Sequence, residues 1–154
     1  MTGTTDFGVI TSKAELDNSD PNVHLHNPNR LAFDIFLDRV LDYVGSYHLK
    51  LQGEVDAIVF SGGVGEKGLD FRRLIGQRAE CLGYRKISPE LNRKGGRTDD
   101  VVFDISESRQ EQPGARTKQL LVCKTDEQVR SGTRYLVVVI HDLIARDGQG
   151  MHRG

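Results

Sequence analysis

The sequence predicts an α/β fold, in which short buried strands alternate with amphipathic helices. The run 57–60 is apolar, rich in β-branched residues and bounded by polar or glycine residues, which is typical of a buried strand. Glycines occupy positions 62, 63 and 65 directly after it. In residues 69–83 apolar side chains then recur at helical spacing, and Gly83 provides a C-terminal cap. We expect the rest of the chain to be organised around this unit of strand, glycine turn and helix.

Before this unit the sequence predicts a loop-rich segment and one long helix. Residues 1–29 contain no long periodic segment and are dense in Thr, Ser, Asp, Asn and Pro, so we expect mostly loop. A helix is predicted over 29–51, with Asn29 as its N-cap, because Pro28 discourages a helix further upstream. Its apolar side is expected to cover the sheet and consists of Leu31, Ala32, Ile35, Phe36, Val40, Tyr43, Val44 and Tyr47.

After Gly83 the sequence predicts further strands and a last helix. In chain order we expect a short strand at 84–88, a charged loop at 89–100, a strand at 101–105, a flexible connection at 106–119 and a strand at 120–123. A helix is then expected to open with Thr125 or Asp126 as its N-cap. Its apolar face would contain Val129, Thr133, Leu136, Val137, Ile140 and either Leu143 or Ile144.

Composition and charge exclude several classes of protein. The 154 residues carry a net charge of −1 with scattered basic side chains, so we expect no binding to nucleic acid or to a membrane surface. No apolar run approaches the length of about 18 residues that a membrane span needs. Residues 1–6 lack the apolar core of a signal peptide. These features predict a cytoplasmic protein.

The glycine segment is the candidate nucleotide-binding motif. A glycine turn lets backbone N–H groups approach a phosphate, and the start of the following helix contributes partial positive charge. Residues 63–68 also match the pattern G-x-G-x-x-G, so an NAD(P)-binding oxidoreductase of the Rossmann type is an alternative. That alternative requires an acidic residue at the end of the next strand, whereas Glu90 falls in a segment that contains proline. By itself the motif is also compatible with a turn that binds nothing.

The residues on both sides of the glycine segment also resemble the sequence of acetate kinases. The chain reads Asp56-Ala-Ile-Val-Phe-Ser-Gly-Gly-Val-Gly-Glu66, then Arg72, then Glu80-Cys-Leu-Gly83, where the family reads roughly D-A-(L/I)-V-F-T-G-G-I-G-E-N, a helix and F-L-G. The predicted helix at 29–51 resembles the family helix that precedes this strand. The matching segments occur in the family order, which makes the resemblance specific.

Two further stretches resemble family motifs that contact the nucleotide and its metal. Residues 2–8 resemble a stretch whose Asp-Phe-Arg triplet contacts the nucleotide; Asp6 and Phe7 match, but Gly8 stands where arginine is usual. Without the family match, Asp6 is expected to cap a local turn. Residues 124–128 resemble a segment whose first glutamate approaches the metal of Mg-ATP. By that match Glu127 is the candidate metal residue; otherwise it is a carboxylate favoured in the first turn of a helix.

The resemblance implies a fold and a function. The fold would be the C-terminal domain, incomplete, of the ribonuclease-H-like kind found in the actin-like ATPase superfamily. Residues 1–28 would be a loop-rich segment with a nucleotide-site motif, 29–145 the nucleotide-binding core and 146–154 a flexible tail. The function would be the nucleotide side of an acetate kinase, which uses ATP and Mg²⁺ to convert acetate into acetyl phosphate. Nucleotide contacts are then expected from Asp6, Phe7, Gly62, Gly63, Val64, Gly65, Glu66 and Lys67.

The resemblance assigns no catalytic residue to this chain. In the family, the catalytic aspartate, the histidine and arginine that stabilise the transferring phosphoryl group, and the acetate pocket lie upstream of the first matching motif. Acetate or another short carboxylate would therefore bind through the missing half, and we expect the chain alone to be inactive. A homodimer is a further expectation. A non-catalytic interaction module is the alternative if the remaining half of the cleft cannot bind nucleotide.

Overall fold

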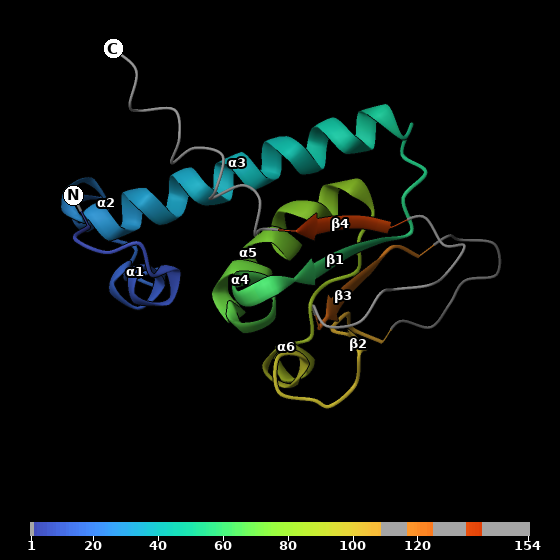
Figure 1. The fold of residues 1–154 in the computed structure, drawn as a ribbon. Coiled ribbons are helices and arrows are strands. Elements are labelled where there is room, and N and C mark those ends of the chain that lie inside the picture. The colour runs from blue at the N-terminus through green and yellow to red at the C-terminus, as the bar shows by residue number, and fades with distance from the viewer. Residues whose placement is uncertain (1, 109–116, 125–134, 140–154) are drawn as a thin grey trace, which may run out of the picture.

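The computed structural model describes residues 2–108, 117–124 and 135–139, and it confirms the predicted α/β fold (Figure 1). In chain order the elements are α1 Phe7–Lys13, α2 Pro21–His26, α3 Pro28–Lys50, β1 Ala57–Ser61, α4 Gly62–Lys67, α5 Leu69–Ala79, the 3₁₀ turn η1 Glu80–Leu82, α6 Pro89–Gly95, β2 Val102–Asp104, β3 Gln119–Cys123 and β4 Tyr135–Val139. Within the described residues, no helix is both long and apolar enough to span a membrane.

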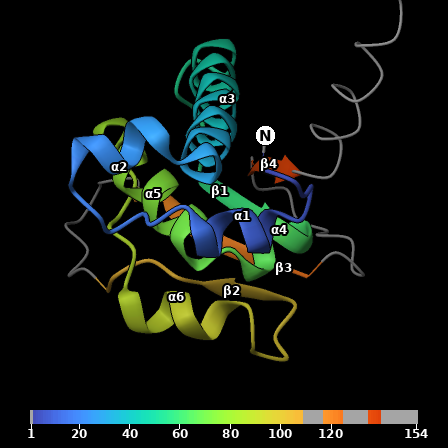
Figure 2. The same ribbon diagram turned by 90° about the vertical axis from the view of Figure 1, so that its left-hand side faces the viewer.

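The sheet has the strand order β2-β3-β1-β4, with β1 between two parallel neighbours. Ile58 of β1 lies opposite Leu120 of β3 and Leu136 of β4, and β2 is antiparallel to β3. Helices α3, α5 and α6 lie on the same side of the sheet (Figure 2). The predicted strands at 57–60, 101–105 and 120–123 are therefore present, with no end shifted by more than one residue.

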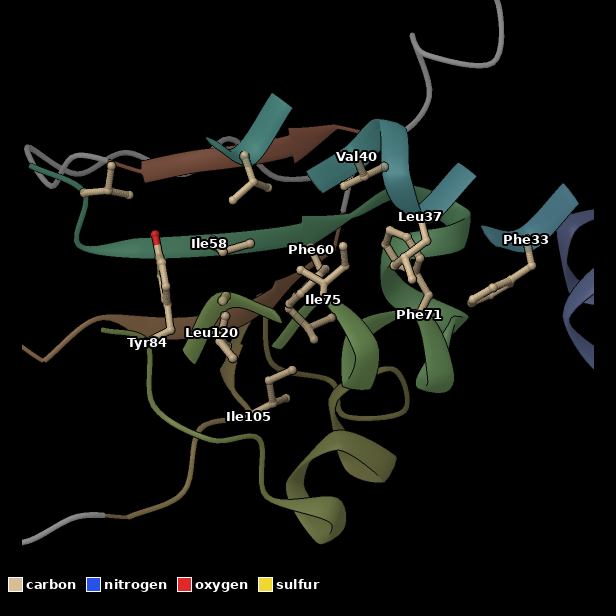
Figure 3. Packing of buried hydrophobic residues seen from close by; sticks show 14 of the residues in the cluster. Phe33, Leu37, Val40, Ile58, Phe60, Phe71, Ile75, Tyr84, Ile105 and Leu120 are labelled. Atoms are coloured by element: carbon tan, nitrogen blue, oxygen red, sulfur yellow. The ribbon is translucent and has the colours of Figure 1, made fainter. Parts of the chain in front are cut away.

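The hydrophobic core lies between the sheet and its helices. Alternate side chains of a strand point to opposite faces of the sheet, so every second strand residue faces these helices. From the strands it takes Ile58, Phe60, Leu120 and Val122, and from the helices Phe33, Leu37, Val40, Val44, Phe71, Ile75 and Ala79. Figure 3 shows side chains of this cluster gathered between the strands and the helices. The opposite face of the sheet carries Ala57, Val59, Leu121 and Cys123, which are also buried.

The N-cap of helix α3 lies two residues earlier than predicted. Asn27, and not Asn29, is its N-cap: the Asn27 Oδ1 accepts hydrogen bonds from the backbone N–H groups of Asn29 (2.9 Å) and Arg30 (3.2 Å). Pro28 occupies the first helical position, where its missing N–H costs nothing because that group would have no helical partner. Proline therefore starts this helix and does not exclude it.

The predicted buried face of α3 is only partly correct. Val40 and Val44 are buried as expected, and Ala32 and Phe36 pack partly against the core. Four other residues of the predicted face are half exposed: Leu31 (59%), Ile35 (51%), Tyr43 (50%) and Tyr47 (44%). The buried row instead contains Phe33, Leu37 and His48. Since both rows are apolar or aromatic in part, periodicity alone could not decide which one faces the sheet.

Two segments predicted as loops are helical. Residues 7–13 and 21–26 form α1 and α2, and 89–95 form α6. Each is too short for apolar periodicity to be detected, but each carries an N-cap; that of α2 is Asp20, whose Oδ1 accepts from Asn22 N–H (2.9 Å). Asp6 Oδ1 accepts from the N–H groups of Gly8 (2.8 Å) and Val9 (3.3 Å), and Ser88 Oγ accepts from Leu91 N–H (3.3 Å). The predicted strand at 84–88 is reduced to isolated bridges of Tyr84 with Lys118 and Ile87 with Ser106.

The expected last helix is wrong where the structure describes it. Residues 135–139 form strand β4 beside β1, although Leu136 and Val137 were expected on a helix face. Five consecutive aromatic or aliphatic residues, three of them valine, suit a strand that pairs along an apolar neighbour. The expected N-cap at Thr125 or Asp126, the candidate metal residue Glu127 and the apolar positions Val129, Thr133, Ile140, Leu143 and Ile144 lie outside the described residues.

Candidate functional site

The glycine segment forms a short helix and not the open turn that the sequence predicted. α4 begins at Gly62 directly after β1, and Gly68 separates it from α5. Gly62 has φ of +72°, a conformation that residues with a Cβ rarely adopt. Its N–H donates to Glu66 Oε1 at 3.1 Å, so the carboxylate of α4 closes back on the start of its own helix.

The glycines of α4 have different roles. A Cβ at Gly65 would lie only 2.9 Å from the carbonyl carbon of Phe60, so this glycine lets α4 pack against the backbone of β1. A Cβ at Gly68 would lie 2.5 Å from the carbonyl oxygen of Val64. A Cβ at Gly63 would meet nothing within 4 Å. The same is true of Gly62, but Gly62 is buried, whereas Gly63 is exposed and leaves open space that a ligand could occupy.

That space belongs to a cavity of about 640 Å³ between α1 and the α4–α5 segment. Figure 1 shows α1 and α4 at the end of the sheet toward which β1 points, where ligands bind in open α/β sheets. The cavity is lined by Asp6, Phe7, Gly8, Thr11, Ser12, Gly63, Val64, Lys67, Gly68, Leu69 and Asp70. Two predicted motifs that are far apart in the sequence thus meet around one cavity.

The structure brings together some of the predicted site residues but not all. Asp6, Phe7, Gly63, Val64 and Lys67 line the cavity, whereas Gly62, Gly65 and Glu66 do not. Sequence reasoning missed the contributions of Thr11, Ser12, Leu69 and Asp70 to the lining. Thr11 and Ser12 lie four residues after Phe7 and Gly8, which also line the cavity, so recognising α1 would have found them.

The Phe7 ring packs inward. Its centroid lies 5.5 Å from that of Phe33, 4.5 Å from that of Phe36 and 6.1 Å from that of Phe71. These contacts join α1 to α3 and α5, and aromatic pairs in this range stabilise packing. Phe7 thus anchors the α1 wall of the cavity.

The charges around the cavity are unevenly paired. Asp70 forms an ion pair with Arg73 (3.0 Å), and Arg73 also reaches Asp17 (3.4 Å). Among the described residues, the exposed Lys67 has no ion-pair partner. The same part of the chain holds no group of three or more histidine, cysteine, aspartate or glutamate side chains that could bind a metal. Of the lining residues that the structure describes, Lys67 is therefore the cation available to an anionic ligand.

Behind the α4–α5 wall lies Arg72, which is only 1% exposed. Its guanidinium donates to backbone carbonyls of α4 and to Asn92 of α6. Burial lowers the pKa of Arg72 to about 10, because the charged form is desolvated. The group nevertheless remains protonated at neutral pH.

Comparison with known proteins identifies the family. The model of the acetokinase family matches residues 4–129, a range that contains both cavity motifs. The chain belongs to the acetokinase family. A probable acetate kinase of Neurospora crassa is 42% identical over 138 residues, which cover 83% of this chain and 29% of that protein. One from Emericella nidulans is 40% identical over 128 residues, covering 83% of this chain and 27% of that protein.

A solved structure of an acetate kinase supports the same fold. The acetate kinase from Entamoeba histolytica superposes with a TM-score of 0.58 at 20% sequence identity, covering 79% of this chain and 27% of that one. This acetokinase-family chain therefore spans less than a third of the length of these relatives. Its family membership confirms the resemblance found in the sequence and sets aside the NAD(P)-dependent oxidoreductase.

Proposed function

We propose that this chain is the nucleotide-binding part of an acetate kinase, a phosphotransferase that converts ATP and acetate to ADP and acetyl phosphate. The observation that carries the proposal is the cavity in which the segment around Asp6 and Phe7 meets the segment Gly63–Lys67. Both segments lie within the range that matches the acetokinase family. A nucleotide is a ligand of suitable size for a cavity of about 640 Å³.

The lining of the cavity suits the parts of a nucleotide. Lys67 supplies a cation for the phosphates, and Gly63 leaves room for a ligand to approach the backbone of α4. Val64 and Leu69 provide an apolar surface for the base. The hydroxyls of Thr11 and Ser12 donate to the carbonyls of Phe7 and Val9, so they can accept hydrogen bonds from ribose hydroxyls. In this proposal the chain binds and orients the nucleotide, and none of its side chains takes part in the chemical step.

The chain alone is proposed to be inactive in phosphoryl transfer. That reaction needs in-line positioning and cations on the developing charge of the transferring group. The proposed acetate pocket and catalytic groups belong to the part of the relatives that this chain does not span. Mg²⁺ would bring positive charge to the nucleotide phosphates, with Glu127 as its candidate residue in this chain.

Finer features of the family are proposed on the same basis. We assign the fold to the ribonuclease-H-like kind of the actin-like ATPase superfamily, with residues 29–145 as the nucleotide-binding core. We further propose that the whole protein is cytoplasmic and homodimeric, and that it binds neither nucleic acid nor membranes. Acetate or another short carboxylate would be the second substrate of the whole protein.

A thermal-shift titration tests the proposed function. A ligand that binds only the native state raises the melting temperature as its concentration exceeds its Kd. We expect ATP and ADP to raise the melting temperature of the 154-residue chain and NAD to leave it unchanged. A shift with NAD alone would contradict the proposal, and no shift with any nucleotide would favour a non-catalytic interaction module.

Adding the arginine that is usual in the family at Gly8 should tighten ATP binding. Gly8 lines the cavity, and a Cβ there would meet only Asp6 Oδ1, at 3.2 Å. A Gly8→Arg side chain would place a cation near the phosphates, so we expect the Kd for ATP to fall about 3- to 10-fold at low salt. Added salt should reduce the gain, because an exposed charge contact is screened. Titration calorimetry at two ionic strengths measures both effects, with Gly8→Gln as the uncharged control; equal Kd values for the two variants would contradict the prediction.

Glu127 should make nucleotide binding depend on Mg²⁺. Mg²⁺ prefers oxygen ligands and commonly reaches a carboxylate through water. We expect Mg²⁺ to tighten ATP binding to the wild-type chain, and Glu127→Gln to remove most of that gain without changing the affinity measured in EDTA. The neighbouring substitution Asp126→Asn is the control for loss of one negative charge. Equal dependence on Mg²⁺ in the wild-type and Glu127→Gln chains would assign the metal to other residues.

A further inference from the structure

Two backbone carbonyls near the end of α4 accept hydrogen bonds from a side chain of α5. The last carbonyls of any helix lack amide partners from their own helix. Gly68 N–H donates to Val64 O (2.8 Å) and ends the helix, so the carbonyls of Gly65 and Glu66 must find other donors. Both accept hydrogen bonds from Nη1 of Arg72, at 2.7 Å and 2.6 Å. A buried arginine thus completes the hydrogen bonding of the glycine helix.

The same guanidinium binds α6. Arg72 Nε donates to Asn92 Oδ1 (2.7 Å), and Nη2 donates to the backbone carbonyl of Asn92 (2.8 Å). Asn92 is 5% exposed, and its Nδ2 donates to the carbonyl of Leu69 (3.1 Å) in the first turn of α5. We call Arg72 and Asn92 together the Arg72–Asn92 clamp. It connects the end of α4, the start of α5 and the body of α6.

The packing around the clamp is tight. A Cβ at Gly96, which follows α6, would collide with the carbonyl oxygen of Glu66. The end of α6 therefore lies directly against the end of α4. All four hydrogen bonds of Arg72 go to neutral oxygens, in a fork that matches the planar guanidinium. A cation at the C-terminal end of a helix is also favoured by the helix dipole.

We propose that Arg72 and Asn92 are positioning residues for the nucleotide site, a role that rests on the proposed function. The clamp lies behind the wall that Gly63 and Lys67 of α4 and Leu69 of α5 present to the cavity. Neither clamp residue lines the cavity, so neither touches the ligand. By holding the ends of α4 and α5, the clamp sets the spacing at which these residues form one surface. Loss of that spacing weakens binding, because a displaced wall loses its contacts with the ligand.

The decisive variant is Arg72→Lys, measured by titration calorimetry with ATP and with adenosine. Lysine keeps the positive charge but cannot donate to four oxygens in a fork. We expect the Kd for both ligands to rise at least about tenfold, since hydrogen bonds from a charged group are lost. A loss for ATP alone would indicate that Arg72 acts on the phosphates and not on the spacing of the whole wall, and would overturn the positioning role. An unchanged Kd for both ligands would also overturn it.

Two controls on α5 separate positioning from a general effect of replacing arginine by lysine and from a loss of stability. Arg78→Lys makes the same change at an exposed position and should leave the Kd and the melting temperature unchanged. Ile75→Val removes a methyl group from the core, where Ile75 is fully buried, and should lower the melting temperature without changing the Kd. If Ile75→Val weakens binding as much as Arg72→Lys at a similar melting temperature, the effect is one of stability and the proposal fails.

Hydrogen exchange tests the clamp without any ligand. We expect backbone amides of residues 64–70 to exchange faster in Arg72→Lys than in wild type, while those of 37–44 in α3 stay protected. Asn92→Ala removes two of the side-chain bonds and should show the same pattern more weakly, so it decides the matter if Arg72→Lys does not fold. Unchanged exchange in residues 64–70 would overturn the proposal. If the wild-type chain binds neither ATP nor adenosine, the proposed function fails, and exchange still decides whether the clamp holds the wall.

Discussion

Gly63→Val is expected to abolish ATP binding while the domain stays folded. A Cβ at Gly63 meets no atom within 4 Å, so valine has room in the unliganded protein. The same space belongs to the cavity of about 640 Å³, and the branched side chain would fill the place where a nucleotide approaches α4. The backbone at Gly63 does not have positive φ, so the change adds no conformational strain. We expect the Kd for ATP to rise at least about 100-fold, which corresponds to roughly 2.7 kcal/mol.

Titration calorimetry and thermal melting of the same Gly63→Val sample test this expectation. The melting temperature should stay within about 3 °C of wild type, because a change of 1 kcal/mol shifts it by about 2–4 °C in a chain of this size. Gly63→Ala is the graded control, and its smaller side chain should weaken binding less than valine does. A folded Gly63→Val chain with wild-type affinity would place the nucleotide elsewhere.

Gly65→Val, the same change two positions later, is expected to destabilise the fold. A Cβ at Gly65 would lie 2.9 Å from the carbonyl carbon and 3.3 Å from the Cα of Phe60. These are backbone atoms in the central strand β1, so they cannot move without disturbing pairing with β3 and β4. Overpacking of this kind typically costs about 1–3 kcal/mol and occasionally more. We expect a loss at the upper end of that range.

Urea unfolding of the Gly63→Val and Gly65→Val chains gives the comparison directly. Both variants introduce the same β-branched residue into α4, so helix propensity is matched and the difference reports the packing against Phe60. The Gly65→Val midpoint should fall well below that of Gly63→Val. Equal midpoints would mean that α4 can move away from β1 at little cost, contrary to the contact with Phe60.

The sequence determined the elements whose signal is local. The apolar run at 57–60 has turn residues on both sides and becomes β1, and the caps at Gly83 and Asp6 act within a few residues of their own position. The order of the family motifs also identified the acetokinase family, because such motifs are read from the chain without knowledge of its packing. These predictions depend on neighbours in sequence, and the sequence contains them completely.

The tertiary structure decided which surfaces meet. Helix α3 has two partly apolar rows, and the position of the sheet buries Phe33 and Leu37 while it leaves Tyr43 and Tyr47 half exposed. β4 is a strand because β1 offers it a parallel edge, a partner more than 70 positions earlier in the chain that no local window includes. Short helices such as α1 are stable through contacts like those of Phe7, and their own length carries little periodicity.

The candidate site shows the same division. The sequence named Asp6, Phe7 and the glycines as one group, but it could not distinguish Gly63, which opens on the cavity, from Gly65, which packs on Phe60. Nor could it reveal that Arg72 and Asn92 meet behind α4, since 20 residues separate them in the chain. Side-chain direction and contacts between distant segments are set by packing, so the roles of these residues became visible only when the helices were placed against the sheet.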